Sequence, residues 1–138
     1  MCADGHEYFD HDADIGIVGR GASVERAFEA AARAMFAIQT DLAAVRANER
    51  IAIAFEESDT ELALATWLNA LLAAARERGL ALCEFGLERD GERWSGWARG
   101  DRWREEYVRG TEVKGATLTM LDVKQDSEGW QARCVVDV

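Results

Sequence analysis

Proline is absent from the 138 residues of the sequence. Because proline-rich segments commonly serve as linkers, its absence favours one compact domain that spans residues 1–138. No apolar run approaches the roughly 20 residues that cross a membrane. Residues 1–7 also lack the basic and then apolar order of a signal peptide. We therefore expect a cytoplasmic protein with no membrane segment.

Cysteine and histidine are scarce, and their spacing matches no familiar chemical site. Cys2, Cys83 and Cys134 form no CxxC pair, so they resemble neither a disulfide framework nor a zinc site. We expect Cys83 and Cys134 to be core thiols. His6 and His11 are the only histidines, and no spacing suggests a nucleophile with its base. Phosphate-loop, serine-hydrolase and zinc-protease motifs are also missing, which predicts a protein that is not an enzyme.

Basic residues are few relative to acidic ones, since 16 Lys and Arg against 26 Asp and Glu give a formal net charge of -10. This surplus opposes contact with many phosphates, so we predict no direct nucleic-acid binding. Residues 99–109 combine arginines with Trp103 and Tyr107, as some RNA-binding patches do. Asp101 and Glu105 interrupt the run, which favours an ordinary mixed-charge hairpin.

Hydrophobic periodicity predicts two helices among several strands. The first helix spans residues 23–38 with Ser23 as N-cap, and the second runs from the cap Asp59 to Gly79. The predicted strands cover residues 14–19, 51–55, a hairpin that turns at Asp90–Gly91, 113–123 and 130–136. This order predicts an α+β fold in which two helices pack on one face of a mostly antiparallel β-sheet.

Carboxylates near both ends of the chain form the strongest candidate site. If the first and last strands lie side by side, Asp14, Asp137 and the α-carboxylate of Val138 converge on one oxygen-rich pocket that suits a divalent cation. Ca²⁺ is the ion expected in isolation, with Mg²⁺ or Mn²⁺ as alternatives. On the residues alone, an aspartate at the position of Asp14 is more often a turn or capping residue than a metal ligand, and Asp137 is more simply a solvated polar end of a strand.

Gly110–Lys114 forms a second candidate site. If Val113 points inward, strand alternation places Glu112 and Lys114 together on the opposite face. There they form either a functional charged pair or a solvated strand face, and composition alone favours the latter.

Several short motifs, in their order and spacing, resemble the archease family over nearly the whole chain. They are His11–Gly16, the apolar positions between Glu25 and Phe36, Thr40–Asp41, Trp67–Asn69, Gly110–Lys114 and Asp137–Val138. Archeases are small α+β proteins that serve as cofactors of the RtcB-type RNA ligase, promoting its metal-dependent guanylylation and multiple turnover in tRNA splicing or RNA repair. The resemblance implies an activator with that ligase as partner.

The resemblance also implies roles for individual residues. Asp14, Asp137 and Val138 match the family's divalent-cation ligands, while Glu112 and Lys114 match residues of its functional face. Two positions depart from the family pattern. Asp12 replaces the more common threonine and adds a carboxylate beside the site, and Leu118 lies in a stretch where the family often has a threonine and tyrosine pair after the lysine.

Two other functions stay open. One is a general chaperone-like or calcium-binding module without a dedicated ligase. The other is a hydrolase that uses Asp12 and Asp14, which is disfavoured because no hydrolase motif accompanies these carboxylates. The sequence predicts no particular oligomeric state.

Overall fold

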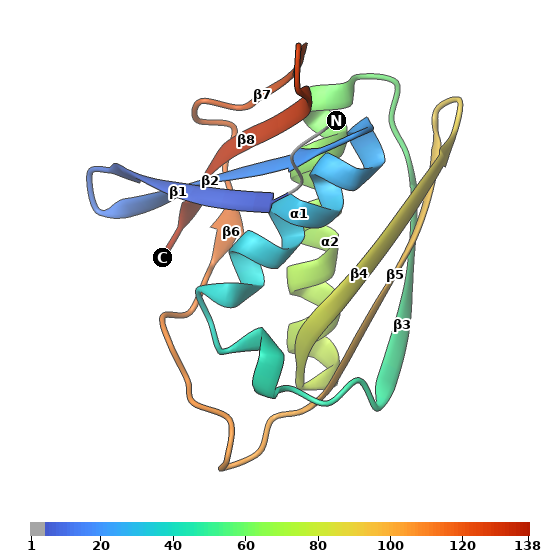
Figure 1. Cartoon of the computed structure of the whole chain (residues 1–138). Coiled ribbons are helices and arrows are strands. Elements are labelled where there is room, and N and C mark those ends of the chain that lie inside the picture. Colours follow the sequence, from blue (N-terminus) through green and yellow to red (C-terminus); the bar gives the residue numbers. More distant parts are fainter. Residues whose placement is uncertain (1–4) are drawn as a thin grey trace.

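The structure, a computed structural model, describes residues 5–138 and consists of two helices and eight strands (Figure 1). In chain order the elements are β1 (Gly5–His11), β2 (Asp14–Gly21), α1 (Val24–Ala37), the short 3₁₀ helix η1 (Leu42–Ala44), β3 (Glu49–Glu56), α2 (Thr60–Arg78), β4 (Leu80–Asp90), β5 (Arg93–Arg102), β6 (Gly115–Ala116), β7 (Asp122–Asp126) and β8 (Gly129–Asp137). Cys2 lies outside the described residues. In the described part of the chain, neither helix is both long enough and apolar enough to span a membrane.

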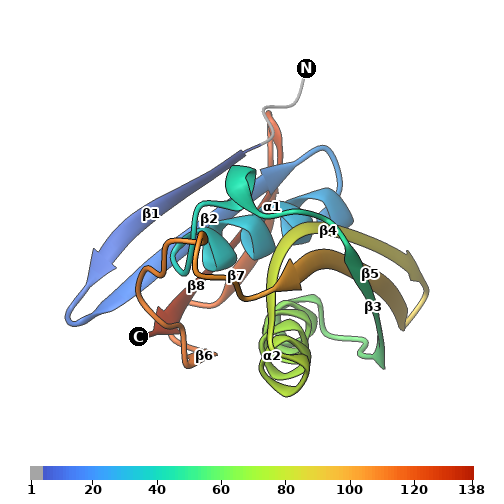
Figure 2. The ribbon, with the colours of Figure 1, turned by 90° about the horizontal axis from the view of Figure 1, so that it is seen from below.

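The strands form two antiparallel sheets. The predicted α+β class is confirmed, but the structure has two sheets where we expected one. One sheet has the order β1-β2-β8-β6, with β7 also paired to β8, and the other has the order β3-β5-β4. Helix α1 packs against β1, β2 and β8 and also against β4, so it lies between the two sheets. The three-stranded sheet curves around α2, as Figure 2 shows from below.

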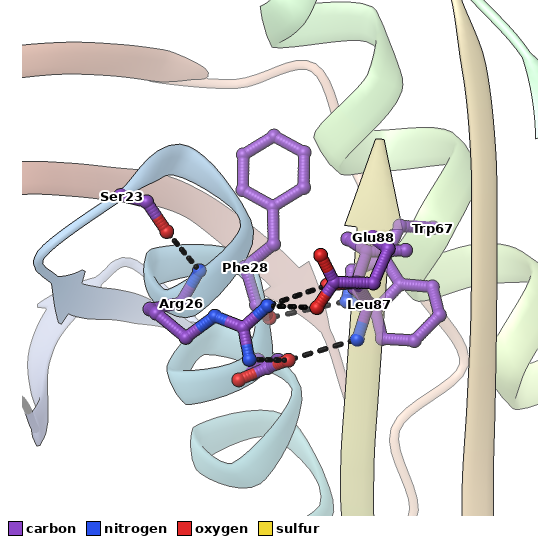
Figure 3. Close-up of polar contacts among 7 residues, drawn as sticks. Ser23, Arg26, Phe28, Trp67, Leu87 and Glu88 are labelled. Atoms are coloured by element: carbon purple, nitrogen blue, oxygen red, sulfur yellow. Dashed lines mark hydrogen bonds and ion pairs between the residues drawn. The ribbon is translucent and has the colours of Figure 1, made fainter. Parts of the chain in front are cut away.

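Side chains of α1 fix the helix against β4, the edge strand of the three-stranded sheet. Arg26 donates through Nη2 to the Leu87 carbonyl (2.8 Å), and the buried Glu29 carboxylate accepts the Leu87 N–H (2.8 Å) (Figure 3). Arg26 also pairs with Glu29 (2.9 Å) and with Glu88. Burial raises the pKa of Glu29, against the opposing effects of the Leu87 hydrogen bond and the Arg26 charge. Side chains of α1 thus satisfy the N–H and the carbonyl of Leu87 on this edge strand.

Both helices begin at their predicted capping residues, and α2 also ends at its predicted cap. The Ser23 hydroxyl accepts the Arg26 N–H (3.2 Å), and the Asp59 carboxylate accepts the N–H groups of Glu61 (2.9 Å) and Leu62 (3.0 Å). Gly79 ends α2 in the left-handed conformation, with φ of 65°.

Stacked aromatic rings fill the space between α1, α2 and the three-stranded sheet. Trp94 stacks on Phe28 with ring centroids 5.2 Å apart and on Phe55 at 5.8 Å. The buried Trp67 indole donates to the Phe28 carbonyl (3.1 Å). Cys134 also belongs to this core, and burial raises the pKa of its thiol to about 12. Cys83 is only half-buried, in a smaller cluster beside Tyr107.

The predicted strand over residues 113–123 is wrong. Only two short segments of this range pair with β8: β6 pairs with its C-terminal end, and β7 pairs with its N-terminal half. Residues 117–121, between them, are not part of a strand. Met120 has a positive φ of 54°, which an extended strand does not allow. Thr117 donates its N–H (3.0 Å) and its hydroxyl (2.8 Å) to the Val135 carbonyl. The Val135 N–H donates to the Thr119 carbonyl (3.2 Å). The loop is therefore held against β8, although it is not a strand.

The arginine-rich run contributes a buried polar cluster. It begins in β5 and continues into the loop after it, where the Asp101 carboxylate accepts hydrogen bonds from Arg104 Nε (2.6 Å) and the Tyr107 hydroxyl (2.6 Å). Asp101 is only 1% exposed. The hydrogen bonds from Arg104 and Tyr107 hold the pKa of Asp101 well below its usual range. The cluster anchors the start of the long connection from β5 to β6.

The first prediction concerns this anchor. Asp101→Asn should lower the free energy of unfolding, because a neutral amide cannot replace a carboxylate paired with Arg104. Since the folded pKa is depressed, the carboxylate stabilises the fold above the ordinary aspartate pKa of about 4, and this contribution is lost as the pH falls below it. Urea unfolding from pH 7 to pH 3 should therefore show the gap between wild type and variant narrowing on acidification. The exposed Asp10→Asn is the control, and a gap independent of pH would contradict the assignment.

Candidate metal and partner-binding site

The pairing of β2 with β8 brings the two ends of the chain together, as the candidate cation site requires. Ile15 pairs with Val136, so one further step along the same register places Asp14 opposite Asp137. Val136 is fully buried, and strand alternation therefore directs both carboxylates to the face opposite the core. Side chains directly opposite each other in an antiparallel pair have Cβ atoms about 5 Å apart. The two carboxylates thus share one end and one face of the sheet.

The two aspartates of this arrangement offer oxygen atoms as ligands, and His11 pairs with Asp14 across the β1–β2 turn. Asp14 is half-buried, Asp137 is exposed, and Val138 is half-buried with its side chain against the core. Within residues 5–138, no three side chains of the His, Cys, Asp or Glu type gather closely enough to hold a metal ion. The donor chemistry suits a hard cation, but two side-chain carboxylates fall short of the six to eight oxygens that Ca²⁺ takes.

The turn before β2 accounts for the unusual Asp12. Asp12 and Ala13 join β1 to β2 as a two-residue connection, since His11 pairs with Asp14. Asp12 has φ of 54°, a left-handed conformation that aspartate and asparagine tolerate better than β-branched threonine. Its side chain is 93% exposed, and its carboxylate lies 3.9 Å from Nδ1 of His11. The geometry of the turn is thus a sufficient reason for the aspartate.

Glu112 and Lys114 lie in a loop rather than in the predicted strand, yet the expected alternation holds. Val113 is fully buried, whereas Glu112 and Lys114 are both exposed. The Lys114 N–H donates to the Asp137 carbonyl (2.7 Å), which joins this loop to the end of β8. The structure therefore brings the loop of Glu112 and Lys114 next to Asp137.

Polar side chains from α2 and from the turn after α1 hold this loop, and sequence reasoning did not assign them that role. Arg76 donates through Nη2 to the carbonyls of Val113 (2.6 Å) and Lys114 (2.7 Å), and Gln39 accepts the Val113 N–H (3.0 Å). Asn69 clamps Ala116 by accepting its N–H (2.9 Å) and donating to its carbonyl (3.0 Å). Asn69 and Arg76 are seven residues apart and so share one face of α2. Two polar residues at that spacing in an apolar helix are the signal that could have identified them.

Two large apolar side chains are exposed in the loop that joins β6 to β7. Leu118 is 65% exposed and Met120 is 43% exposed, both in the loop held against Val135 of β8. They extend the candidate site along the edge of β8.

Taken together, these features define a small α+β protein whose paired chain ends present carboxylates beside a fixed, exposed loop. The family model of the Archease protein family matches residues 6–138. The chain belongs to the archease family.

Similar proteins cover almost the full length of the chain. It is 34% identical to protein archease of Sulfolobus acidocaldarius, over 96% of this chain and 97% of that protein. It is 31% identical to protein archease of Methanothermobacter thermautotrophicus, over 97% and 99% of the two chains. The solution structure of protein 1598 from Methanobacterium thermoautotrophicum superimposes with a TM-score of 0.82 at 29% identity, covering 97% of this chain and 99% of that one.

A crystal structure from Thermotoga maritima, described as an archease and possible chaperone, shares the fold. Its TM-score is 0.65 at 20% identity, and the match covers 96% of each chain. These similarities confirm the expected family and the α+β fold.

The second prediction separates conformation from charge at Asp12. Asp12→Asn should leave the free energy of unfolding nearly unchanged, because asparagine also tolerates positive φ. Asp12→Thr should lower it by about 1 kcal/mol, because a β-branched residue is strained there. Urea denaturation measures both variants. Equal stabilities for the two variants would contradict a conformational role for this residue.

Proposed function

We propose that the protein is a non-enzymatic activator of an RtcB-type RNA ligase in the cytoplasm, promoting its metal-dependent guanylylation and multiple turnover. Membership of the archease family supports this function. The observation that carries it is the pairing of β2 with β8, which aligns Asp14 with Asp137 beside Lys114. The ligase contributes the catalysis, and this protein contributes ligands and a docking surface.

The proposed role of the carboxylates is to hold a divalent cation together with the partner. Asp14 and Asp137, with the α-carboxylate of Val138, supply hard oxygen ligands but leave coordination positions open. Water fills these positions in the isolated protein, where Ca²⁺ is the expected ion. Atoms of the ligase or its nucleotide fill them in the complex, where Mg²⁺ or Mn²⁺ is an alternative. A cation held in this way offsets repulsion between a nucleotide triphosphate and the acidic groups around it.

The proposed contact face extends from the carboxylates along the adjoining loops. Exposed Glu112 and Lys114 supply charges of both signs, and exposed Leu118 and Met120 supply apolar contacts. Asp12 adds a further carboxylate at the tip of the β1–β2 turn. An interface with apolar anchors and a charged rim has the usual anatomy of a protein–protein contact. The net charge of -10 favours a partner with a basic surface.

The third prediction tests the carboxylates. Asp14→Asn and Asp137→Asn remove a cation ligand without changing side-chain size, so each should reduce stimulation of ligase guanylylation by at least about tenfold. The assay measures transfer of labelled GMP to a purified RtcB-type ligase with limiting amounts of this protein. Asp90→Asn, at the tip of the distant β4–β5 hairpin, is the matched control and should stimulate fully. Full stimulation by both site variants would overturn the proposal.

A second candidate function is that of a general chaperone, because the Thermotoga maritima structure is described as a possible chaperone. That activity depends on exposed apolar surface rather than on carboxylates, so the fourth prediction differs in its variants. Under this function Leu118→Ser should weaken protection of an aggregating client, measured by light scattering, whereas Asp14→Asn should not. Under the ligase proposal the wild type gives no protection of unrelated clients, and protection at equimolar protein would favour the second candidate.

A further inference from the structure

A concave site lies beside the loop that carries Glu112, and Glu112 is part of its lining. Its volume is about 460 Å³, within the range of small-molecule sites. It opens between the C-terminal end of α2 and the long connection from β5 to β6, which passes near the lower end of α2 in Figure 1. Leu72, Ala75 and Leu80 supply its apolar floor.

Two guanidinium groups give this pocket a positive character that the chain as a whole does not have. Arg76 and Arg109 both line it, and within residues 5–138 neither forms an ion pair. Glu112 also lines the pocket and is its single acidic lining residue. The pocket therefore has a local excess of positive charge in a chain whose net charge is -10.

Both guanidinium groups are held in place. The Arg109 guanidinium lies over the Trp103 ring, 4.0 Å from its centroid, in a cation–π contact. Arg76 uses Nη2 for the carbonyls of Val113 and Lys114, which leaves Nε and Nη1 without a hydrogen-bond acceptor among the described residues. Fixed arginines with unused N–H donors are suited to a carboxylate or a phosphate.

The end of α2 provides an alternative explanation for Arg76, because cations are favourable near helix C-termini. It does not explain Arg109, which comes from a different segment and stacks on Trp103. Nor does an interaction with the helix C-terminus account for the cavity between the two arginines.

We propose that this pocket binds a small molecule or group that carries an oxyanion, either a phosphate or a carboxylate, between Arg76 and Arg109. The anion site is independent of the proposed ligase partner. Two hydrogen bonds connect it to the carboxylate site. Arg76 donates to the Lys114 carbonyl (2.7 Å), and the Lys114 N–H donates to the Asp137 carbonyl (2.7 Å). An anion that binds the Arg76 guanidinium is therefore expected to shift the backbone of Lys114 and the end of β8.

The fifth prediction is tested by NMR titration of the full-length, ¹⁵N-labelled protein at constant pH and ionic strength. The probes are inorganic phosphate, acetate and GMP. Saturable shifts are expected at the amides of Thr111 and Glu112 and at the Trp103 indole, followed by smaller shifts at Lys114 and Asp137. A response confined to phosphate and GMP identifies a phosphate ligand, and tighter binding of GMP identifies a nucleotide. An equal response to acetate identifies a carboxylate.

Two variants and a control sharpen the result. Arg109→Gln should weaken binding of the responding probe by about tenfold, because one charge-assisted interaction is lost. Arg93→Gln, on the exposed face of the three-stranded sheet, should leave binding unchanged. Arg76→Lys keeps the charge but loses the two-carbonyl clamp, so it should abolish the shifts at Lys114 and Asp137.

Shifts that do not saturate with any probe, or equal affinities of wild type and Arg109→Gln, would overturn the anion site. Saturable binding with no response at Lys114 or Asp137 would overturn its coupling to the carboxylates. These outcomes are independent of ligase stimulation, so failure of the anion site and failure of the proposed function are distinguishable.

Discussion

The antiparallel pairing of β2 with β8 is the interaction on which the rest of the structure depends. It joins residues 15–21 to residues 130–136 and places both strands against α1. A close approach of helix and sheet makes this possible, because a Cβ atom at Gly19 would lie 2.3 Å from the backbone of Ala27 and Ala31. Since β1, β6 and β7 all attach to β2 or β8, the whole five-stranded sheet follows from this one pairing. The same pairing aligns Asp14 with Asp137.

A second constraint positions the long connection between β5 and β6. Residues 103–114 form no helix or strand, yet they are fixed at both ends. Asp101, Arg104 and Tyr107 hold the first part as a buried polar cluster. Side chains of Gln39 and Arg76 hold the last part by hydrogen bonds to its backbone. The backbone groups that would pair within a sheet are therefore satisfied by side chains, which leaves Glu112 and Lys114 free to face solvent.

The helices were predictable because their signals are local. Ser23 and Asp59 cap the two helices and Gly79 ends the second, and each acts within a few residues of its own position. The division into two sheets was not predictable, because α1 packs against both sheets through residues far apart in the chain, such as Arg26 and Leu87. The strand predicted at residues 113–123 failed for a similar reason. Its alternating Val113, Thr117 and Thr119 follow the period of a strand, but contacts with Gln39, Asn69 and Val135 bend the chain instead.

The candidate site was also only partly predictable from the sequence. Asp14 and Asp137 could be nominated from their oxygen chemistry and from the family resemblance, and the register of β2 and β8 supports their proximity. The contributions of Asn69 and Arg76 were hidden, because a polar residue on a helix surface gives no indication of which backbone it contacts. The pocket of Arg76 and Arg109 was hidden as well, since it combines a helix end with a loop 33 positions further along the chain.

Paramagnetic relaxation by Mn²⁺ tests most directly whether the paired chain ends form one cation site. With substoichiometric Mn²⁺ added to the ¹⁵N-labelled protein, the account predicts strong broadening of the amide signals of both Asp14 and Asp137. The signal of Gly91, at the tip of the β4–β5 hairpin, should stay sharp. Broadening centred on another part of the molecule, or at Asp14 without Asp137, would contradict the account.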